Sequence, residues 1–237
     1  MRKEKLSRLS DYKKINKFHL DYLVYHYLIR DVEYAINSYS KGKVLDIGCG
    51  NKPYEPTFAG KITGYTGCDI IQSDLNKVDI ICEATKIPLS SESFDTIFST
   101  QTIEHIADHQ SMVNEAYRLV KPGGYFILSG PMYWPIHEEP HDYFRFTKYG
   151  FEYILTKAGF QIEKILPNGG MWAVSGQTFL HSLAHGDSKF FLTRAWRFVF
   201  FKLRMQWICN SFYKWLDRKD YNPVSTLNYV IIARKNG

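Results

Sequence analysis

Cysteine is scarce in this sequence, with four residues among 237, and no two of them form a Cys-x-x-Cys pair. They are Cys49, Cys68, Cys82 and Cys209. This spacing argues against a disulfide framework or a zinc site, and predicts buried or strand-end thiols in a reducing cytosol. The chain also lacks an apolar run of about eighteen residues, so no membrane-spanning helix is predicted. Residues 18–29 are apolar but short, and contain Asp21 and His26, so no signal peptide is predicted.

No Gly-Lys-Ser/Thr is present, which excludes a loop of the kind that holds a triphosphate. Residues 44–50 instead form an apolar strand that delivers Asp46, Gly48 and Gly50 to the edge of a sheet. The two glycines let the backbone approach a ligand closely and adopt positive φ. The dinucleotide fingerprint needs a third glycine where Pro53 stands, so an adenosine ligand without a pyrophosphate fits better. Pro53 also predicts that the next helix starts late or is distorted.

A second acid follows the glycine loop by about twenty residues, as in dinucleotide-binding folds. Residues 64–70 predict a short strand that ends at Asp69, whose carboxylate can accept hydrogen bonds from both ribose hydroxyls of an adenosine. Beyond it, strands are predicted over residues 78–82 and 93–99, a helix over residues 110–121, and a Pro-Gly-Gly turn over residues 122–124. Strands that alternate with helices indicate an α/β fold.

Six short motifs occur along the chain in the order DIGCG, GCDI, EATKIPL, FDTIFS, EHI and LVKPGGYFIL. In this order they resemble the class I S-adenosylmethionine-dependent methyltransferases, over roughly residues 40–166 and a last strand near 227–234. The resemblance implies a Rossmann-like, seven-stranded, mostly parallel sheet with an antiparallel last strand and helices on both faces. It also implies S-adenosylmethionine as the cofactor, held by Asp46, Gly48, Gly50, Asp69, Ile70, Glu83, Ala84 and Thr100.

Three parts are predicted along the chain. Residues 1–40 form an N-terminal helical cap, with helix over most of 3–39, which either covers the cofactor or packs against the sheet. Residues 41–171 and 223–237 form the methyltransferase core, and residues 172–222 form a basic, aromatic helical insertion. The remaining predicted elements are a helix over 148–158, capped by Thr147 and ended by Gly159, and strands over 160–166 and 226–233.

Residues 130–147 form a long loop just past the end of a predicted strand, where open α/β sheets bind ligands. Its string His-Asp-Tyr-Phe-Arg-Phe-Thr resembles a stretch in bacterial methyltransferases linked to polysaccharide and small-molecule biosynthesis. His141 is the first candidate for a catalytic base, with Asp142 orienting it or a neighbour, because histidine titrates near neutral pH. Arg145 is a candidate for gripping a carboxylate or phosphate of the acceptor.

Further candidates flank this loop. Tyr133 and Trp134 are predicted to form an apolar wall for the acceptor, and His105 is a second candidate base because it follows a strand at the same edge. A purely structural interpretation stays open, in which the charged groups of the loop pair with one another and its aromatics belong to the core. Two prolines and irregular spacing argue against a metal site in the loop, so no metal is expected.

Positive charge is concentrated at both ends of the sequence. Residues 1–20 carry a net charge of +5 and residues 187–237 of +7, which points to an anionic partner. Within residues 189–216, one apolar helical face is predicted from Leu192, Trp196, Val199, Leu203 and Trp207. Phe198 and Phe201 fall among basic residues on other sides, as in helices that lie on anionic lipid. Attachment to an anionic membrane, a homodimer face and a lid over the substrate are the alternatives.

The sequence therefore predicts a cytoplasmic methyltransferase, with peripheral membrane association as one of these alternatives. Its expected acceptor is a small molecule or glycan, including a lipid-linked one, and O-methylation is the expected reaction. An RNA methyltransferase and a non-catalytic scaffold with this fold are the alternatives. The basic ends favour RNA. The sequence, however, has no appended RNA-binding module and no Asn/Asp-Pro-Pro-Tyr/Phe motif, and the intact Asp46 and Asp69 argue against a scaffold.

Overall fold

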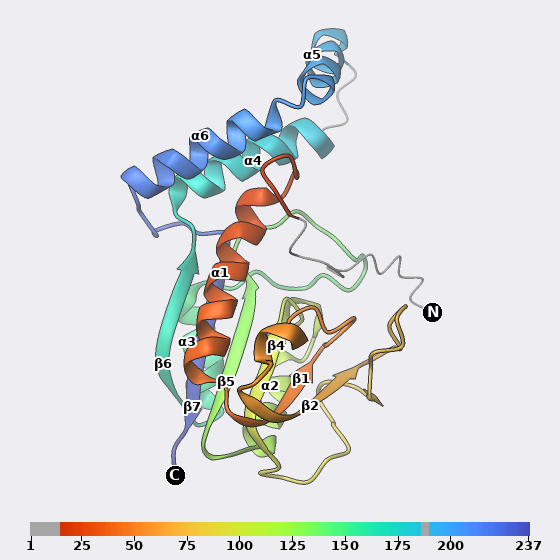
Figure 1. Cartoon of the computed structure of the whole chain (residues 1–237), viewed down its shortest axis with the longest axis vertical. Helices are drawn as coiled ribbons and strands as arrows, with labels where there is room; N and C mark the ends of the chain where they lie inside the picture. The colour runs from red at the N-terminus through yellow and green to blue at the C-terminus, as the bar shows by residue number, and fades with distance from the viewer. Residues whose placement is uncertain (1–14, 186–189) are drawn as a thin grey trace.

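A single sheet organises the computed structural model, which describes residues 15–185 and 190–237 (Figure 1). Its seven strands lie in the order β3-β2-β1-β4-β5-β7-β6. They are β1 (Gly42–Ile47), β2 (Ile62–Asp69), β3 (Ile80–Ile81), β4 (Phe94–Thr100), β5 (Val120–Pro131), β6 (Phe160–Asn168) and β7 (Asn228–Lys235). The first five pair in parallel, whereas β7 runs antiparallel to both neighbours. The fold predicted from the motifs is confirmed.

Parallel pairing explains why the central strands read as continuous apolar runs. Val44, Leu45 and Ile47 of β1 are fully buried, because helices cover both faces of the sheet. The register pairs Ile47 with Cys68 of β2, so β1 and β2 end side by side. The carboxyl ends of the parallel strands therefore meet at one edge, where the glycine loop, Asp69 and the loops after β4 and β5 all lie.

Short helical elements cover the two faces of the sheet. They are α1 (Tyr22–Tyr39), the 3-10 helix η2 (Glu55–Phe58), the 3-10 helix η3 (Ile103–His105), α2 (His109–Leu119) and α3 (Lys148–Lys157). On one face, α1 and η2 bury Leu28, Ile36 and Phe58 against the sheet. On the other face, α2 and α3 bury Met112 and Phe151 in the larger core cluster. Removal of these apolar surfaces from water is the main driving force for this arrangement.

The predicted helices of the core agree with the structure to within two residues at each end. Thr147 caps α3, since its Oγ1 accepts a hydrogen bond from the N–H of Gly150 at 3.2 Å, and Gly159 follows the helix with φ of +103°. The helix expected over 3–39 begins at Tyr22 within the described part of the chain, and residues 1–14 lie outside it. After the glycine loop only the short η2 forms, in accord with the effect predicted for Pro53.

The segment between β6 and β7 contains α4 (Met171–His185), α5 (Phe191–Lys202) and α6 (Gln206–Lys219). In Figure 1, α4 and α6 lie side by side against the end of α1, and α5 lies farthest from the sheet. Because β6 ends and β7 begins at the site edge, the three helices stand over that edge. None of the described helices combines the length and apolarity needed to cross a bilayer.

The single apolar face predicted from Leu192 to Trp207 is wrong, because the helix breaks between α5 and α6. Arg204 has φ of +52°, and the chain turns there. The break lets Phe200 and Met205 pack against Leu180 of α4, so tertiary packing overrides the helical periodicity. Residues 186–189, among them the basic Lys189, lie outside the described residues.

Candidate functional site

The glycine loop after β1 depends on its two glycines. Gly48 has φ of +77°, and a Cβ there would lie 2.2 Å from Thr102 Oγ1, so only glycine fits without a shift. The N–H of Gly48 donates to the carbonyl of Cys68 at 2.8 Å. The N–H of Gly50 donates to Asp69 Oδ2 at 3.0 Å. The loop and the acid at the end of β2, about twenty residues apart in sequence, are thereby held as one unit.

A cavity of about 510 Å³ opens beside Asp69. Asp69 Oδ1 accepts a hydrogen bond from the N–H of Ile70 at 2.7 Å, and the Ile70 side chain, although apolar, is 49% exposed. The lining includes Gly48, Asp69, Ile70, Glu83, Ala84, Thr102, His105, Ile106 and His141. A carboxylate beside an exposed apolar surface suits a ligand that has hydroxyl groups and a flat apolar ring.

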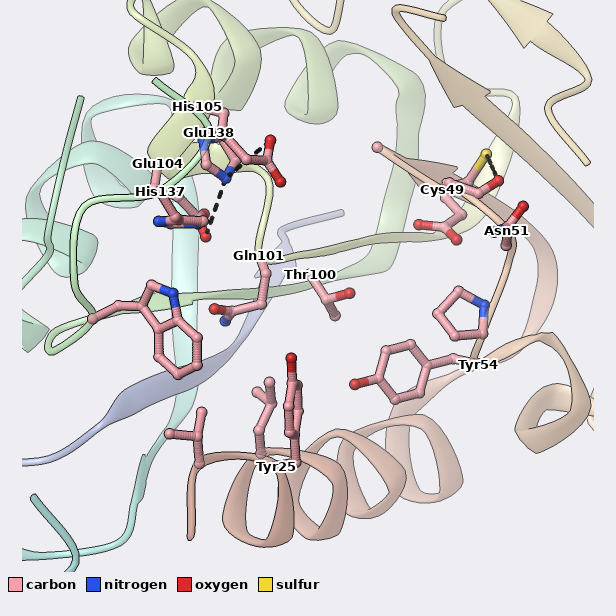
Figure 2. A pocket seen from close by; sticks show the side chains of 17 residues that line it. Tyr25, Cys49, Asn51, Tyr54, Thr100, Gln101, Glu104, His105, His137 and Glu138 are labelled. Atoms are coloured by element: carbon pink, nitrogen blue, oxygen red, sulfur yellow. Dashed lines mark hydrogen bonds and ion pairs between the residues drawn. The ribbon is translucent and has the colours of Figure 1, made fainter. Parts of the chain in front are cut away.

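A second cavity, of about 310 Å³, lies between the glycine loop, α1 and the loops after β4 and β5 (Figure 2). Its lining includes Tyr25, Asp46, Gly48, Gly50, Tyr54, Thr100, Gln101, Glu104, His105, Trp134, His137 and Glu138. Gly48 and His105 line both cavities. The two spaces therefore meet at these residues, and a ligand in one can face a ligand in the other.

Asp46 is buried at the end of β1, beside the smaller cavity. The hydroxyl of Tyr65 donates to its Oδ2 at 2.5 Å. Burial raises the pKa of Asp46 to about 7, although the hydrogen bond from Tyr65 opposes this shift. The carboxyl group is thus held near its titration point at neutral pH.

Four titratable side chains gather at one end of the smaller cavity: Glu104, His105, His137 and Glu138 (Figure 2). His105 Nε2 lies 3.9 Å from Glu104 Oε1 and 3.8 Å from Glu138 Oε2. Its Nδ1 lies 2.8 Å from the carbonyl oxygen of His141, and a carbonyl can only accept a hydrogen bond. In the neutral ring, Nδ1 therefore carries the proton and Nε2 carries the lone pair on the side of the carboxylates.

Glu104 is the most deeply buried member of this group, with 1% of its surface exposed. Its Oε2 has no hydrogen-bond partner within the described residues. Burial raises the pKa of Glu104 to about 8. The rings of His105 and His137 meet edge to face, with their centroids 4.8 Å apart.

Arg145 fastens the loop after β5. All five of its N–H groups donate hydrogen bonds, two to the carboxylate of Asp142 at 2.6 and 2.7 Å and three to the carbonyls of Trp134, Pro135 and Phe144. These contacts match the structural alternative, in which Arg145 pairs with Asp142, and the role of Arg145 in gripping an acceptor stays a prediction. Burial alone would raise the pKa of Asp142, but these bonds hold it well below its usual range.

The same carboxylate binds the backbone of a histidine, which is His137. Asp142 Oδ2 accepts the backbone N–H of His137 at 3.0 Å and lies 3.2 Å from its ring Nδ1. His141, the first candidate base from the sequence, has its Nδ1 3.1 Å from the hydroxyl of Tyr143 and lines the larger cavity. The geometry thus favours His105, which lines both cavities, over His141.

The two aromatic residues predicted as an acceptor wall both contact His181 of α4, but only one of them lines a described cavity. Trp134 lines the smaller cavity, whereas Tyr133 stacks on the ring of His181 and packs with the cluster formed by α1 and α4. Tyr133 is absent from the lining of both described cavities because a helix of the insertion covers it. This contact joins segments far apart in sequence, so a linear pattern could not indicate it.

Sequence reasoning did not identify Tyr25, Gln101, His137 and Glu138 as site residues, although all four line the smaller cavity. Tyr25 comes from α1, so the leading helix both packs on the sheet and closes the cavity. Gln101 and Glu138 have φ of +50° and +54°, and no sequence signal predicts such a conformation for these residue types. The run of His and Glu residues after residue 136 was the available signal for His137 and Glu138.

Comparison with known proteins finds methyltransferases among the similar proteins. The profile of a family described as a methyltransferase domain matches residues 45–128. Ubiquinone biosynthesis O-methyltransferases of Pseudomonas entomophila (strain L48) and Pseudomonas aeruginosa (strain LESB58) are each 30% identical to the chain, over 141 and 140 residues. Each match covers 54% of this chain and 54% of the relative. The chain thus spans about half the length of the curated relatives that it matches.

Solved structures show the same fold at low identity. Phosphoethanolamine N-methyltransferase 2 of Haemonchus contortus, in complex with S-adenosyl-L-methionine, matches with a TM-score of 0.52 and 17% identity, over 98% of this chain and 61% of that chain. The cyclase SpnF matches with a TM-score of 0.55 and 18% identity, over 89% and 81%. Together, the ordered motifs, the sheet topology and the match of residues 45–128 to the methyltransferase domain show that this part of the chain is similar to S-adenosylmethionine-dependent methyltransferases of class I.

Proposed function

We propose that this protein transfers a methyl group from S-adenosylmethionine to an oxygen of a small molecule. The observation that carries the proposal is the meeting of two cavities at Gly48 and His105. One cavity has the features of a nucleoside site, and the other has an aromatic wall and a cluster of proton acceptors. The names of the curated relatives, O-methyltransferases, support oxygen as the acceptor atom.

The residues of the larger cavity fit the nucleoside of S-adenosylmethionine. Asp69 supplies carboxylate oxygens for the ribose hydroxyls, and its position is fixed by the N–H groups of Gly50 and Ile70. Ile70, Ala84 and Ile106 supply apolar surface for the adenine ring. This is the assignment that the motif resemblance predicted for Asp69, Ile70 and Ala84.

Asp46, Gly50 and Thr100, predicted as cofactor residues, line one end of the smaller cavity, and the residues at its other end fit the acceptor and its proton. When bound, S-adenosylmethionine supplies a methyl group on a positive sulfur; the acceptor oxygen bonds to the methyl carbon, the carbon–sulfur pair returns to sulfur, and the hydroxyl proton passes to the protein. His105 Nε2 can take that proton, and the carboxylate of Glu138, 3.8 Å away, stabilises the resulting imidazolium. Trp134 provides a flat wall for the acceptor, and a cavity of about 310 Å³ suits a small molecule or one sugar unit.

Calorimetric titration with S-adenosylmethionine and S-adenosylhomocysteine tests the cofactor site. The wild type should bind with micromolar affinity, and Asp69→Ala should bind at least tenfold more weakly, because hydrogen bonds to a charged group contribute roughly 1.5–3 kcal/mol each. Asp74→Ala, at an exposed acid outside the cavity lining, is the matched control. Equal affinities of the wild type and Asp69→Ala would contradict the assignment.

An acceptor screen then tests the reaction. Hydroxylated aromatic compounds, glycans and total RNA are offered with radiolabelled S-adenosylmethionine. His105→Gln should lower kcat by about 100-fold or more, as expected for loss of a proton acceptor. His141→Gln should retain most of the activity. The reverse ranking would restore His141 as the base, and labelling of RNA alone would replace the proposal with RNA methylation.

We further propose that α5 attaches the protein to an anionic membrane surface. Phe191, Phe198 and Leu192 are 77%, 65% and 63% exposed, on the helix farthest from the sheet. Basic residues lie among them, and Lys202 Nζ stands 5.3 Å above the ring of Phe198. Exposed aromatics interleaved with positive charge complement an anionic lipid surface. Because the insertion stands over the site edge, attachment would direct the acceptor cavity toward lipid-linked or amphiphilic molecules.

A vesicle flotation assay tests this attachment. The wild type should float with vesicles that contain anionic lipid and not with vesicles of phosphatidylcholine alone. The double variant Phe191→Ser/Phe198→Ser should lose more than tenfold in partitioning, since burial of one Phe contributes roughly 1.5–3 kcal/mol. Tyr149→Ser/Tyr153→Ser removes two exposed aromatics from α3 and is the matched control. Unchanged flotation of the α5 variant, or a dimer in light scattering that only this variant abolishes, would overturn the proposal.

A further inference from the structure

We propose that Glu104, His105 and His137 form a binding site for a divalent transition-metal ion of the zinc or iron(II) type, with Glu138 as a further oxygen ligand. One ligand atom from each of the first three residues lies within 4.8 Å of the others. Two imidazole nitrogens together with carboxylate oxygens suit zinc and iron(II), whereas magnesium and calcium prefer oxygen ligands alone.

The distances within the cluster suit one ion. Zinc binds imidazole nitrogen and carboxylate oxygen at about 2.0–2.2 Å, so neighbouring ligand atoms of a tetrahedral ion lie about 3.4 Å apart. His105 Nε2 lies 3.9 Å from Glu104 Oε1 and 3.8 Å from Glu138 Oε2, so a movement of about 0.5 Å brings each pair to that spacing. A movement of less than about 1.5 Å at the ligand atom of His137 does the same.

The imidazole of His105 is oriented from behind by a hydrogen bond, as metal-binding histidines are, and His137 has a carboxylate close to its ring. The Nδ1–H of His105 donates to the carbonyl of His141, which leaves Nε2 as the ligand atom. Nδ1 of His137 lies 3.2 Å from Asp142, whose carboxylate is in turn held by Arg145. The salt bridge between Arg145 and Asp142 thus has a role in the site, because it holds the carboxylate that lies beside His137.

An independent observation at the same place points to a cation. Glu104 is almost wholly buried, and its Oε2 has no hydrogen-bond partner within the part of the chain that the structure describes. A buried carboxylate oxygen without a partner is costly, and native proteins nearly always satisfy such a group. A metal ion at the cluster supplies that partner directly.

The expectation that no metal binds was based on spacing within residues 137–142 alone. The structure instead combines two ligands from η3 with two from the loop after β5. Since the cluster lines the smaller cavity, a bound ion would lie within reach of an acceptor oxygen; because it would occupy the lone pair of His105 Nε2, it would replace that nitrogen as the group that promotes deprotonation of the acceptor. That role rests on the proposed methyl transfer, whereas binding of the ion does not.

Metal titration of the chain without an oligohistidine tag and without S-adenosylmethionine tests the site. After treatment with a chelator, the protein should bind one Zn²⁺ per chain in calorimetry, and Co²⁺ should produce visible absorption bands of a four- or five-coordinate site. Mg²⁺ should bind far more weakly. His137→Ala and Glu104→Gln should weaken Zn²⁺ binding at least tenfold, and Asp142→Asn by about 10–100-fold. Glu139→Gln, beside Glu138 but exposed, should bind as the wild type does.

Three outcomes would overturn the site. They are absence of Zn²⁺ and Co²⁺ binding to the wild type, equal affinity of His137→Ala and Glu139→Gln, and loss of binding in Cys82→Ser, which would assign the ion to thiols. Circular dichroism of each variant verifies that it is folded. A protein that binds Zn²⁺ but not S-adenosylmethionine would retain the metal site and lose the proposed function, so the two failures are distinguishable.

Discussion

Replacement of Asp46 by asparagine should make the protein more stable at alkaline pH and remove part of its pH dependence. The side chain is buried, and the hydroxyl of Tyr65 donates to it. Asparagine has nearly the same shape, and its amide oxygen can accept the same hydrogen bond. The substitution therefore removes the buried charge and keeps the packing.

The magnitude follows from the pKa of Asp46, which burial raises from 3.8 to about 7. A raised acid pKa means that the folded protein binds the proton more tightly than the unfolded chain does. Stability is thus greatest below about pH 4, falls between pH 4 and 7, and is flat above. The full shift corresponds to about 4 kcal/mol at 1.36 kcal/mol for each pKa unit, of which about 2–3 kcal/mol falls between pH 5 and 8.

Urea unfolding of both proteins at pH 5, 6, 7 and 8 measures this effect. The free energy of unfolding of Asp46→Asn, relative to wild type, should rise by about 2–3 kcal/mol from pH 5 to pH 8. Asp74→Asn, at an exposed acid, should show no such trend. A difference between wild type and Asp46→Asn that stays constant across this range would refute the reasoning.

Further predictions concern stability and are measured by urea unfolding. Thr147→Ala removes the cap of α3 and should cost about 1 kcal/mol; no change would mean that the cap is redundant. Arg145→Met leaves the buried Asp142 without its partner and should cost about 2 kcal/mol, with faster proteolysis in the loop before α3. Phe126→Ala opens a cavity in the core and should cost about 3–5 kcal/mol, whereas Tyr149→Ala at the surface should change stability by less than about 0.5 kcal/mol.

The part of the site that was predictable from the sequence is the part built from local motifs. The strand and loop at 44–50 and the acid Asp69 follow from apolar runs that end in glycine or a carboxylate. Their contact, from the N–H of Gly50 to Asp69, follows from parallel pairing of successive strands. The residues that were hard to predict are those brought together by tertiary structure.

His137 shows why the acceptor side escaped prediction. Its place in the cluster depends on the pairing of Asp142 with Arg145, which folds the loop back toward η3. From the sequence, Asp142 and Arg145 each had two roles open to them, one in the site and one in a structural pair. Only the hydrogen bonds of the folded loop distinguish the two roles. Arg204 is a similar case, because packing of the insertion, not local preference, breaks the helix there.

The pairing of β6 with β7 has a consequence for how the helical insertion arose and can be removed. Asn168 and Asn228 are register partners, so residues 169–227 occupy the place of a hairpin turn. Closing a connection of this length costs only about 2 kcal/mol more than closing a five-residue turn, because loop-closure entropy grows with the logarithm of length. The sheet could therefore acquire, exchange or lose this unit while its strand register stayed the same.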